Sequence, residues 1–204
     1  MSTFRSLDDL VAHVAGLHGT RVLVGIAGAP GAGKSTVAEA LLAALPEAAL
    51  VPMDGYHLPQ SRLRELGRRD RMGASDTFDV PAFVALLREL RFSGGFVLAR
   101  GFDRGIEEPV PDAIPIPPEK RIIVVEGNYL LHDAGGWEEV APLLDETFVL
   151  GLDDEVRRER LIERHARFGK TLEDARAWAL GPDETNARLI AATAARADHE
   201  IALL

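Results

Sequence analysis

A glycine-rich segment between an apolar run and a helix-forming run carries the clearest chemistry in the sequence. Residues 28–36 read GAPGAGKST and match the pattern G-x-x-x-x-G-K-[ST] at every fixed position. Glycines let successive backbone N–H groups turn toward a phosphate, and the N-terminus of the following helix adds positive potential there. We therefore predict a phosphate-binding loop made of Gly28, Ala29, Pro30, Gly31, Ala32, Gly33, Lys34, Ser35 and Thr36.

The lysine and the first hydroxyl of this loop have separate predicted tasks. Lys34 should reach the β- and γ-phosphates of a nucleoside triphosphate, and Ser35 should bind Mg²⁺ through its oxygen. The plain alternative is a glycine-rich turn with a solvent-exposed lysine. The chain has lysine only at 34, 120 and 170, which argues against a chance lysine here. Those positions also leave no Asn-Lys-x-Asp element for reading guanine, which favours ATP.

Two carboxylates follow apolar runs that predict strands. Asp54 follows the run 48–53, and Glu126 ends the run 121–126. Ligands of open α/β sheets bind at the carboxyl ends of strands, which favours a functional position for both residues. Glu126 is predicted to position Mg²⁺ or water, where other P-loop proteins use aspartate. The alternatives are an Asp-Gly turn at Asp54 and a buried, structurally paired Glu126.

A run of arginines between residues 157 and 167 supplies positive charge in an otherwise acidic chain. Helical spacing places Arg157, Arg160, Arg164 and Arg167 within roughly 80° of one helix face. Because like charges at i, i+4 repel, such a stripe indicates an anionic ligand. The alternative is an exposed helix in an arginine-biased sequence.

Three further segments carry a family resemblance. They read MDGYH at 53–57, TFDVP at 77–81 and EGNYLL at 126–131. With the glycine-rich loop, they resemble the uridine kinase, pantothenate kinase and phosphoribulokinase superfamily of P-loop kinases. Within it the chain is most similar to small proteins described as kinases of fructose transport systems. The resemblance runs from about residue 21 to the C-terminus, and it implies ATP and Mg²⁺ as cofactors.

The resemblance also implies roles for individual residues. Asp54 would accept the proton of the attacking substrate hydroxyl, beside Lys34 and Glu126. Arg160 and Arg164 would close over the triphosphate from a helical lid at about 153–180. Asn186 would lie near the adenine, although the start of a helix explains it equally well. The acceptor side would be formed by Asp54, Tyr56, His57, Phe78, Phe102, Asp103, Arg104, Asn128 and Tyr129.

Two residues and one segment bear on the identity of the acceptor. Phe102 stands where the superfamily usually has tyrosine, so a hydroxyl donor is missing and a nucleoside acceptor is less favoured. Asp79 could contact substrate or cap the helix that follows it. The basic segment 62–71 could recognise an anionic acceptor such as a sugar phosphate, or form a surface helix.

The elements that must position these residues alternate between strands and helices. The sequence predicts strands at 21–27, 48–53, 121–126 and 147–150, and a weaker one at 198–203. It predicts helices from the capping Ser6 to Leu17, from Ser35 to Leu45, and over 81–92, with a proline-rich extended surface loop at 107–118. Alternation of this kind favours an α/β fold. We expect one domain over 1–204, a three-layer α/β/α sandwich with a mostly parallel sheet, an insertion at about 56–118 and the lid.

Composition narrows the class of protein further. The chain has 204 residues, a formal net charge of −9 and no cysteine, which excludes disulfides and thiolate metal sites. No apolar run approaches the ~18 residues of a membrane span, and an acidic chain binds nucleic acid poorly. We expect a cytoplasmic protein with a small-molecule acceptor, and flanking helices could pair two copies into a homodimer.

Together these observations predict an ATP-dependent kinase that phosphorylates a hydroxyl of a small metabolite. On resemblance, a sugar such as fructose is the leading acceptor, and a nucleoside or a pantothenate-like alcohol is second. The alternative from another class is a nucleotide-dependent regulatory ATPase with no small-molecule acceptor.

Overall fold

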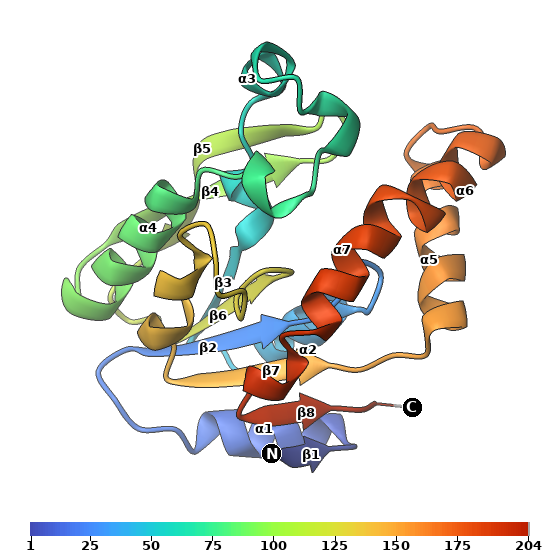
Figure 1. The fold of residues 1–204 in the computed structure, drawn as a ribbon. Coiled ribbons are helices and arrows are strands. Elements are labelled where there is room, and N and C mark those ends of the chain that lie inside the picture. Colours follow the sequence, from blue (N-terminus) through green and yellow to red (C-terminus); the bar gives the residue numbers. More distant parts are fainter. Residues whose placement is uncertain (204) are drawn as a thin grey trace.

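The centre of the protein is a six-stranded sheet in which every neighbouring pair is parallel. The computed structural model describes residues 1–203. The strand order is β1-β8-β7-β2-β6-β3 (Figure 1). The strands are β1 (Ser2–Phe4), β2 (Val22–Ala27), β3 (Ala48–Pro52), β6 (Ile122–Gly127), β7 (Glu146–Leu150) and β8 (His199–Ile201).

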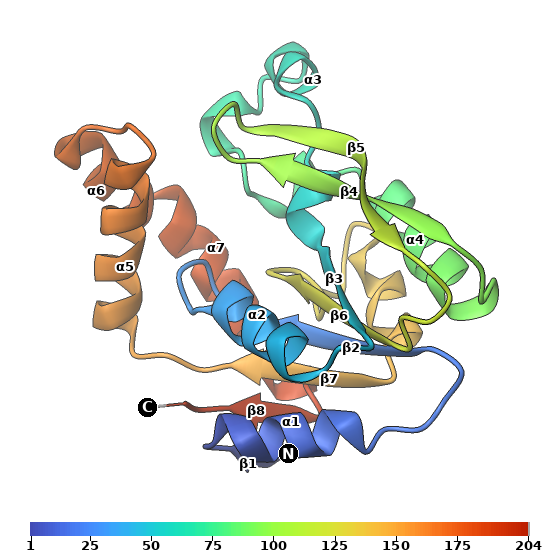
Figure 2. The ribbon, with the colours of Figure 1, turned by 180° about the vertical axis from the view of Figure 1, so that it is seen from behind.

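Helices cover both faces of this sheet, as the predicted α/β/α sandwich requires. On one face lie α1 (Leu7–Ala15) and α2 (Lys34–Ala44), and Figure 2 shows α2 in front of the strands. On the other lie α4 (Val80–Phe92), the segment 129–144 and α7 (Pro182–Ala191). Along β2, Leu23 joins one apolar cluster and Val24 the other, because successive strand side chains point to opposite faces.

The central strands are continuous apolar runs because they are covered on both sides. All six residues of β2 and all six of β6 are buried, which is typical of parallel strands between helical layers. The predicted strand and helix positions are confirmed to within two residues, and the first helix ends at Ala15 rather than Leu17. Its Ser6 caps the helix by accepting from the Asp9 N–H.

The insertion carries a structure of its own. It holds α3 (Gln60–Glu65), α4, and a separate antiparallel pair made of β4 (Val97–Asp103) and β5 (Glu108–Ile116). The prediction of an extended loop at 107–118 is therefore wrong, since most of that segment is β5. Its prolines are tolerated because, among residues 1–203, β5 pairs with β4 alone and its other edge is unpaired.

Two helices follow β7 where the sequence predicts a lid. They are α5 (Asp154–Arg167) and α6 (Leu172–Leu180), and they form a hairpin that stands beyond the carboxyl end of the sheet, with the insertion on the opposite side (Figure 1). We call residues 154–180 the α5–α6 hairpin. Among residues 1–203, no helix has both the length and the apolar character needed to cross a membrane.

Candidate active site

A pocket opens at the carboxyl edge of the sheet, between the glycine-rich loop, the insertion and the α5–α6 hairpin. The loop follows β2, Asp54 follows β3, and Glu126 lies near the end of β6. Most of the predicted site residues line this pocket, although they come from distant parts of the chain. They are Pro30, Lys34, Ser35, Asp54, His57, Phe78, Phe102, Arg104, Glu126, Asn128, Arg164 and Asn186.

The glycine-rich loop packs tightly against the base of α5. Gly31 has a positive φ of 81°, a conformation that glycine adopts without strain. A Cβ there would lie 2.7 Å from Leu161 Cγ and 2.9 Å from the carbonyl oxygen of Arg157. The structure therefore needs glycine at this position, which the pattern leaves variable, both for the turn and for the close approach of α5.

Lys34 is buried inside the loop. Its Nζ donates to the carbonyl oxygens of Gly28 (2.9 Å) and Ala29 (3.0 Å) and to Oδ1 of Asn128 (2.7 Å). Burial lowers the pKa of Lys34 to about 8, although the carboxylates of Glu126 and Asp54 act in the opposite direction. The ammonium is held where the loop would surround a phosphate.

The hydroxyl of Ser35 and the carboxylate of Glu126 lie next to each other. Ser35 Oγ donates to Glu126 Oε1 at 3.1 Å. Burial raises the pKa of Glu126 above its ordinary value, so a nearby cation would favour its ionised form. Two oxygen donors facing one pocket fit Mg²⁺, which prefers oxygen ligands and retains several waters.

Asp54 is accessible from the pocket. Its side chain is 27% exposed, and its Oδ2 accepts from Arg104 Nη2 at 2.9 Å. Burial alone would raise the pKa of Asp54, but the electrostatic effects of His57, Arg104 and Lys34 prevail and hold that pKa below its ordinary value. Asp54 is therefore an ionised carboxylate that a ligand in the pocket can reach.

Comparison with known proteins agrees with this geometry. No family model matches the chain. A "putative fructose transport system kinase" from Silicibacter sp. TM1040 is 36% identical, with a TM-score of 0.89 over 97% of this chain and 99% of its own. "Putative uridine kinase C227.14" of Schizosaccharomyces pombe is 36% identical over 180 residues, which are 80% of this chain and 75% of that protein.

The "ATP-dependent kinase-like protein notR'" of Aspergillus versicolor is 39% identical over 125 residues, 57% of this chain and 73% of its own. The chain belongs to the P-loop ATP-dependent kinases. The kinase also shares its fold with YFH7 of Saccharomyces cerevisiae, with a TM-score of 0.84 at 20% identity. The resemblance predicted from the sequence is confirmed, and the protein is a phosphotransferase that uses ATP and acts on a small-molecule substrate.

An aromatic wall forms one side of the kinase pocket. The ring centroid of His57 lies 4.0 Å from that of Phe78 and 4.9 Å from that of Phe102. Nδ1 of His57 donates to the Asp54 carbonyl oxygen at 2.8 Å, which fixes the ring beside the carboxylate. Burial lowers the pKa of His57. The wall offers flat apolar surface next to the ionised Asp54.

Three predicted acceptor residues lie outside the pocket lining. Tyr56 packs in the core against Phe83, with ring centroids 5.0 Å apart. The hydroxyl of Tyr129 donates to the carbonyl oxygen of Gly73 at 2.7 Å. Asp103 is exposed and accepts from the Gly105 N–H in the turn between β4 and β5. These side chains support elements that carry the pocket rather than facing it.

The four arginines of the predicted stripe on α5 lie in different environments. Arg157 is buried and donates to Glu184 Oε2 at 2.6 Å and to Asp154 Oδ1 at 3.0 Å. For Arg157 the prediction of a bound anionic ligand is therefore wrong, because its anion is a side chain of α7. Of the four stripe residues, only Arg164 lines the pocket, while Arg160 and Arg167 are exposed outside the lining.

Glu184 joins α5 to α7 through more than one arginine. Arg158 Nη2 also donates to its Oε1 at 2.9 Å. Hydrogen bonds from Arg158 and Arg157 lower the pKa of Glu184 to about 2. The base of the α5–α6 hairpin is thus held to α7 by an ionised carboxylate at neutral pH.

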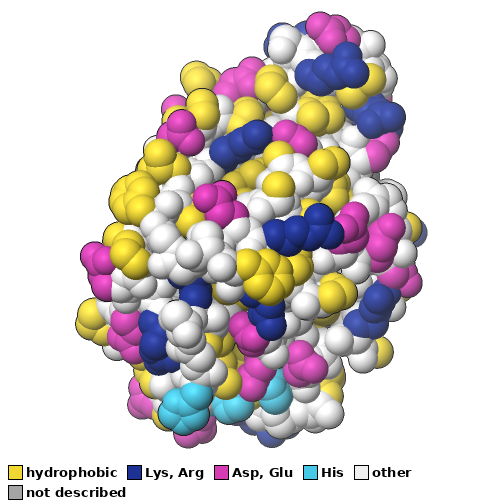
Figure 3. Space-filling view, turned by 90° about the vertical axis from the view of Figure 1, so that its left-hand side faces the viewer, with side chains coloured by type: hydrophobic (Ala, Val, Ile, Leu, Met, Phe, Trp, Pro, Cys, Tyr) yellow, Lys and Arg dark blue, Asp and Glu magenta, His cyan; other side chains and the backbone are white. Residues whose placement is uncertain are grey.

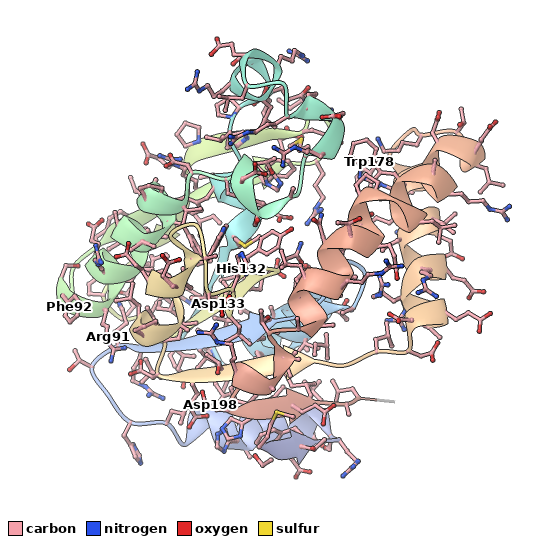
Figure 4. The ribbon with its side chains drawn as sticks, in the orientation of Figure 1. Arg91, Phe92, His132, Asp133, Trp178 and Asp198 are labelled. Carbon is pink, nitrogen blue, oxygen red and sulfur yellow. The ribbon has the colours of Figure 1, made fainter. Side chains whose placement is uncertain are left out.

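Several lining residues were not among the predicted site residues. Trp178, labelled in Figure 4, lies on the side of the hairpin that faces the insertion, with Lys170 Nζ 4.5 Å from its ring centroid. Arg69 belongs to the basic segment noted in the sequence, and it pairs with Glu107 of the β4–β5 turn. The full set is Arg69, Met72, Gly73, Glu107, Gly127, His165, Lys170, Trp178 and Asp183.

The basic segment 62–71 is largely paired within the protein. Besides the Arg69 pair, Arg71 and Arg68 both bind the carboxylate of Asp76. Asn186 reaches the same region from α7, since its Nδ2 donates to the carbonyl oxygen of Gly73 at 3.2 Å. Asp79 caps α4 by accepting from the Ala82 N–H at 3.2 Å, so its predicted structural role is confirmed.

Proposed function

We propose that this kinase transfers the γ-phosphate of Mg²⁺-ATP to a hydroxyl of a small metabolite, with Asp54 as the base. The observation that carries the proposal is the accessible, ionised Asp54 in one pocket with the loop lysine and the Ser35–Glu126 pair. Phosphoryl transfer depends mainly on positioning and on charge stabilisation. A carboxylate beside these groups can hold the attacking hydroxyl and take its proton.

Each part of the pocket has a task in this reaction. The loop amides and Lys34 would hold the triphosphate, which replaces the carbonyl partners of the ammonium. Ser35 and Glu126 would hold Mg²⁺, which neutralises charge on the phosphate oxygens when bound. As the acceptor oxygen bonds to the γ-phosphorus, the bond to the ADP oxygen breaks and the hydroxyl proton passes to Asp54. Arg164, which lines the pocket, would stabilise charge on the transferred group.

Arg104 can change partners during this cycle. It occupies Asp54 Oδ2 at 2.9 Å, one of the two carboxylate oxygens that can accept from an acceptor hydroxyl. An acceptor that takes Oδ2 would displace the guanidinium from Asp54, and the released donors of Arg104 can bind another oxygen of the acceptor. Because Arg104 lies in the turn after β4, this exchange requires little movement of the sheet.

A sugar is the acceptor that we favour, with fructose-like compounds first. The wall of His57, Phe78 and Phe102 can cover the C–H face of a sugar ring, while Asp54 and Arg104 bind its hydroxyls. The name of the Silicibacter relative points to fructose. A nucleoside is second, because the yeast relative is named as a uridine kinase, and a pantothenate-like alcohol would use the same chemistry.

A panel assay tests the proposal. ADP release is measured with ATP and Mg²⁺ in the presence of sugars, nucleosides and pantothenate. We expect one compound to stimulate turnover, and Asp54→Ala to reduce that stimulation by about 10²-fold or more while ATP still binds. Asp8→Ala, an exposed aspartate on α1, is the matched control. Slow turnover that no compound stimulates and that Asp54→Ala leaves unchanged would instead indicate a regulatory ATPase.

A further inference from the structure

Three potential metal ligands meet at the end of the sheet opposite the ATP pocket. His13 lies on α1, Glu146 begins β7 and His199 begins β8. Nε2 of His13 is 2.6 Å from Glu146 Oε2, and Nε2 of His199 is 3.1 Å from the same oxygen. Their ligand atoms all lie within 4.8 Å of one another. Figure 3 shows histidine side chains gathered at the lower end of the molecule, where Figure 1 places α1, β1 and β8.

The backbone explains why these side chains converge. Glu146 and Phe148 lie two residues apart on β7 and so point to the same face, and Phe148 is opposite His199 in the β7–β8 register. On α1, His13 lies next to the buried Leu10 and Val14 at helical spacing, on the side that packs on the sheet. His13 thus occupies a position where the helical pattern would otherwise place an apolar residue.

The surroundings hold both imidazoles in place. The ring centroid of Phe4 lies 5.0 Å from that of His13, and that of Phe148 lies 4.9 Å from that of His199. Nδ1 of His199 is 2.6 Å from Ser2 Oγ. When Nδ1–H donates to this hydroxyl, the lone pair of Nε2 points toward Glu146. Metal-binding histidines commonly have such a partner on their other nitrogen.

We propose that His13, Glu146 and His199 bind one divalent transition-metal ion, with Zn²⁺ as the best match. Two imidazole nitrogens and one carboxylate oxygen form a three-ligand set that zinc completes with water. Tetrahedral zinc separates its ligand atoms by roughly 3.3 Å, so the contacts of Glu146 Oε2 with His13 (2.6 Å) and His199 (3.1 Å) would open by about 0.7 and 0.2 Å. Mg²⁺ prefers an all-oxygen shell and is a poor match.

The ion would act on structure rather than on phosphoryl transfer. The three ligands come from α1, β7 and β8, and Ser2 brings β1 to the same point. Glu146 begins a strand whose carboxyl end leads to the α5–α6 hairpin, so the site lies across the sheet from Asp54 and Glu126. Bound zinc would link the first 15 residues to the last strand, and it would require the tautomer in which each Nε2 presents its lone pair to the ion.

Zinc titration of the whole protein tests the site. Metal-free protein is titrated with ZnCl₂ by calorimetry in excess Mg²⁺, and Tm is recorded with and without zinc. We expect one ion per chain and a rise in Tm. His199→Gln and His13→Gln should each weaken zinc binding at least tenfold and remove the rise in Tm, whereas the exposed His18→Gln should behave like the wild type.

Two outcomes would overturn the proposal. One is the absence of zinc binding, which would leave a hydrogen-bonded His-Glu-His cluster. The other is zinc binding that neither variant changes, which would place the ion elsewhere. X-ray absorption of the zinc-loaded wild type is independent of how the variants fold: two imidazole ligands support the site, and a shell without imidazole contradicts it. Each Tm shift is compared within one variant, so a general loss of stability is not mistaken for a lost ligand.

Discussion

The charge of Lys34 gives the site a pH dependence that can be measured. Burial lowers the pKa of its ammonium to about 8, so the charged form prevails below that pH and declines above it. Because the triphosphate is attracted by the charged form, we expect ATP affinity to fall by about tenfold between pH 7 and pH 9.5. Equilibrium binding of ATP at the two pH values measures the effect.

The control removes the titrating group. Lys34→Met should bind ATP weakly at both pH values, with little change between them. If ATP affinity fell equally with pH in the wild type and in the variant, Lys34 would not be the titrating group. The lowered pKa also affects folding: between about pH 8 and the unfolded value of 10.5, the unfolded chain holds more protons, so the free energy of unfolding should rise with pH in that window.

Arg104 is expected to set the acid limit of activity. Its guanidinium is one of the groups that keep the pKa of Asp54 below its ordinary value. In Arg104→Gln the pKa of Asp54 should rise, so the acid limb of the kcat/KM profile should move to higher pH. KM for the acceptor should also rise. The matched control is Arg62→Gln, which changes an exposed arginine that pairs with Glu65 on α3. If the acid limb of Arg104→Gln stayed at the wild-type pH, Arg104 would not control the pKa of Asp54.

At the scale of elements, one close backbone approach fixes Asp54. Gly55 lies in the turn 53–56 after β3, where a Cβ would come 2.3 Å from the carbonyl oxygen of Arg100 on β4. Gly55→Ala must therefore separate the turn from β4. We expect a loss of about 1–3 kcal/mol in the free energy of unfolding and a larger loss of kcat than of ATP affinity, measured by urea denaturation and kinetics.

A second glycine provides the comparison for this prediction. A Cβ at Gly95, in the loop before β4, would have only the Ser93 carbonyl oxygen near it, at 4.0 Å. Gly95→Ala should therefore leave stability within about 0.5 kcal/mol of the wild type. Equal effects of the two substitutions would show that the contact with Arg100 is unimportant.

Most strands of the central sheet and the helices that follow them could be predicted from the sequence, because they have clear local patterns. Buried parallel strands read as continuous apolar runs, and capping residues such as Ser6 mark where helices begin. The strand β5 was missed because its prolines argue against a central strand, and only its pairing with β4 shows that it is an edge. The three-residue β1 has too little pattern to be seen, since it depends on β8 near the other end of the chain.

The site residues likewise fall into those that local sequence pattern predicts and those that depend on contacts between distant elements. The glycine-rich loop, Asp54 and Glu126 were predictable because each lies directly after or at the end of a strand. Arg157 was misassigned because its partner, Glu184, lies 27 residues away on another helix. No local pattern shows that Trp178 faces the pocket, because its position depends on how the α5–α6 hairpin stands over the sheet.

At the scale of the whole molecule, the charge balance of the pocket differs from that of the acidic chain. The net charge of the chain is −9, yet the basic residues that line the pocket outnumber the acidic ones by five to four. They are Lys34, Arg69, Arg104, Arg164 and Lys170 against Asp54, Glu107, Glu126 and Asp183. These cations come from the loop, the insertion and the α5–α6 hairpin. A triphosphate would be attracted to all three parts at once, so its binding should draw the hairpin toward the insertion.

Tryptophan fluorescence can report this closure because the two tryptophans occupy different environments. Trp178 lines the pocket beneath Lys170, and Trp137 is buried in the core with its Nε1 donating to the Ser75 carbonyl oxygen. A triphosphate that attracts Lys170 would remove the ammonium from the Trp178 ring and change its emission. We expect a non-hydrolysable ATP analogue to shift the fluorescence of the wild type and to leave Trp178→Phe, which retains Trp137, unchanged. A shift that persists in Trp178→Phe would mean that the core rather than the hairpin responds to nucleotide.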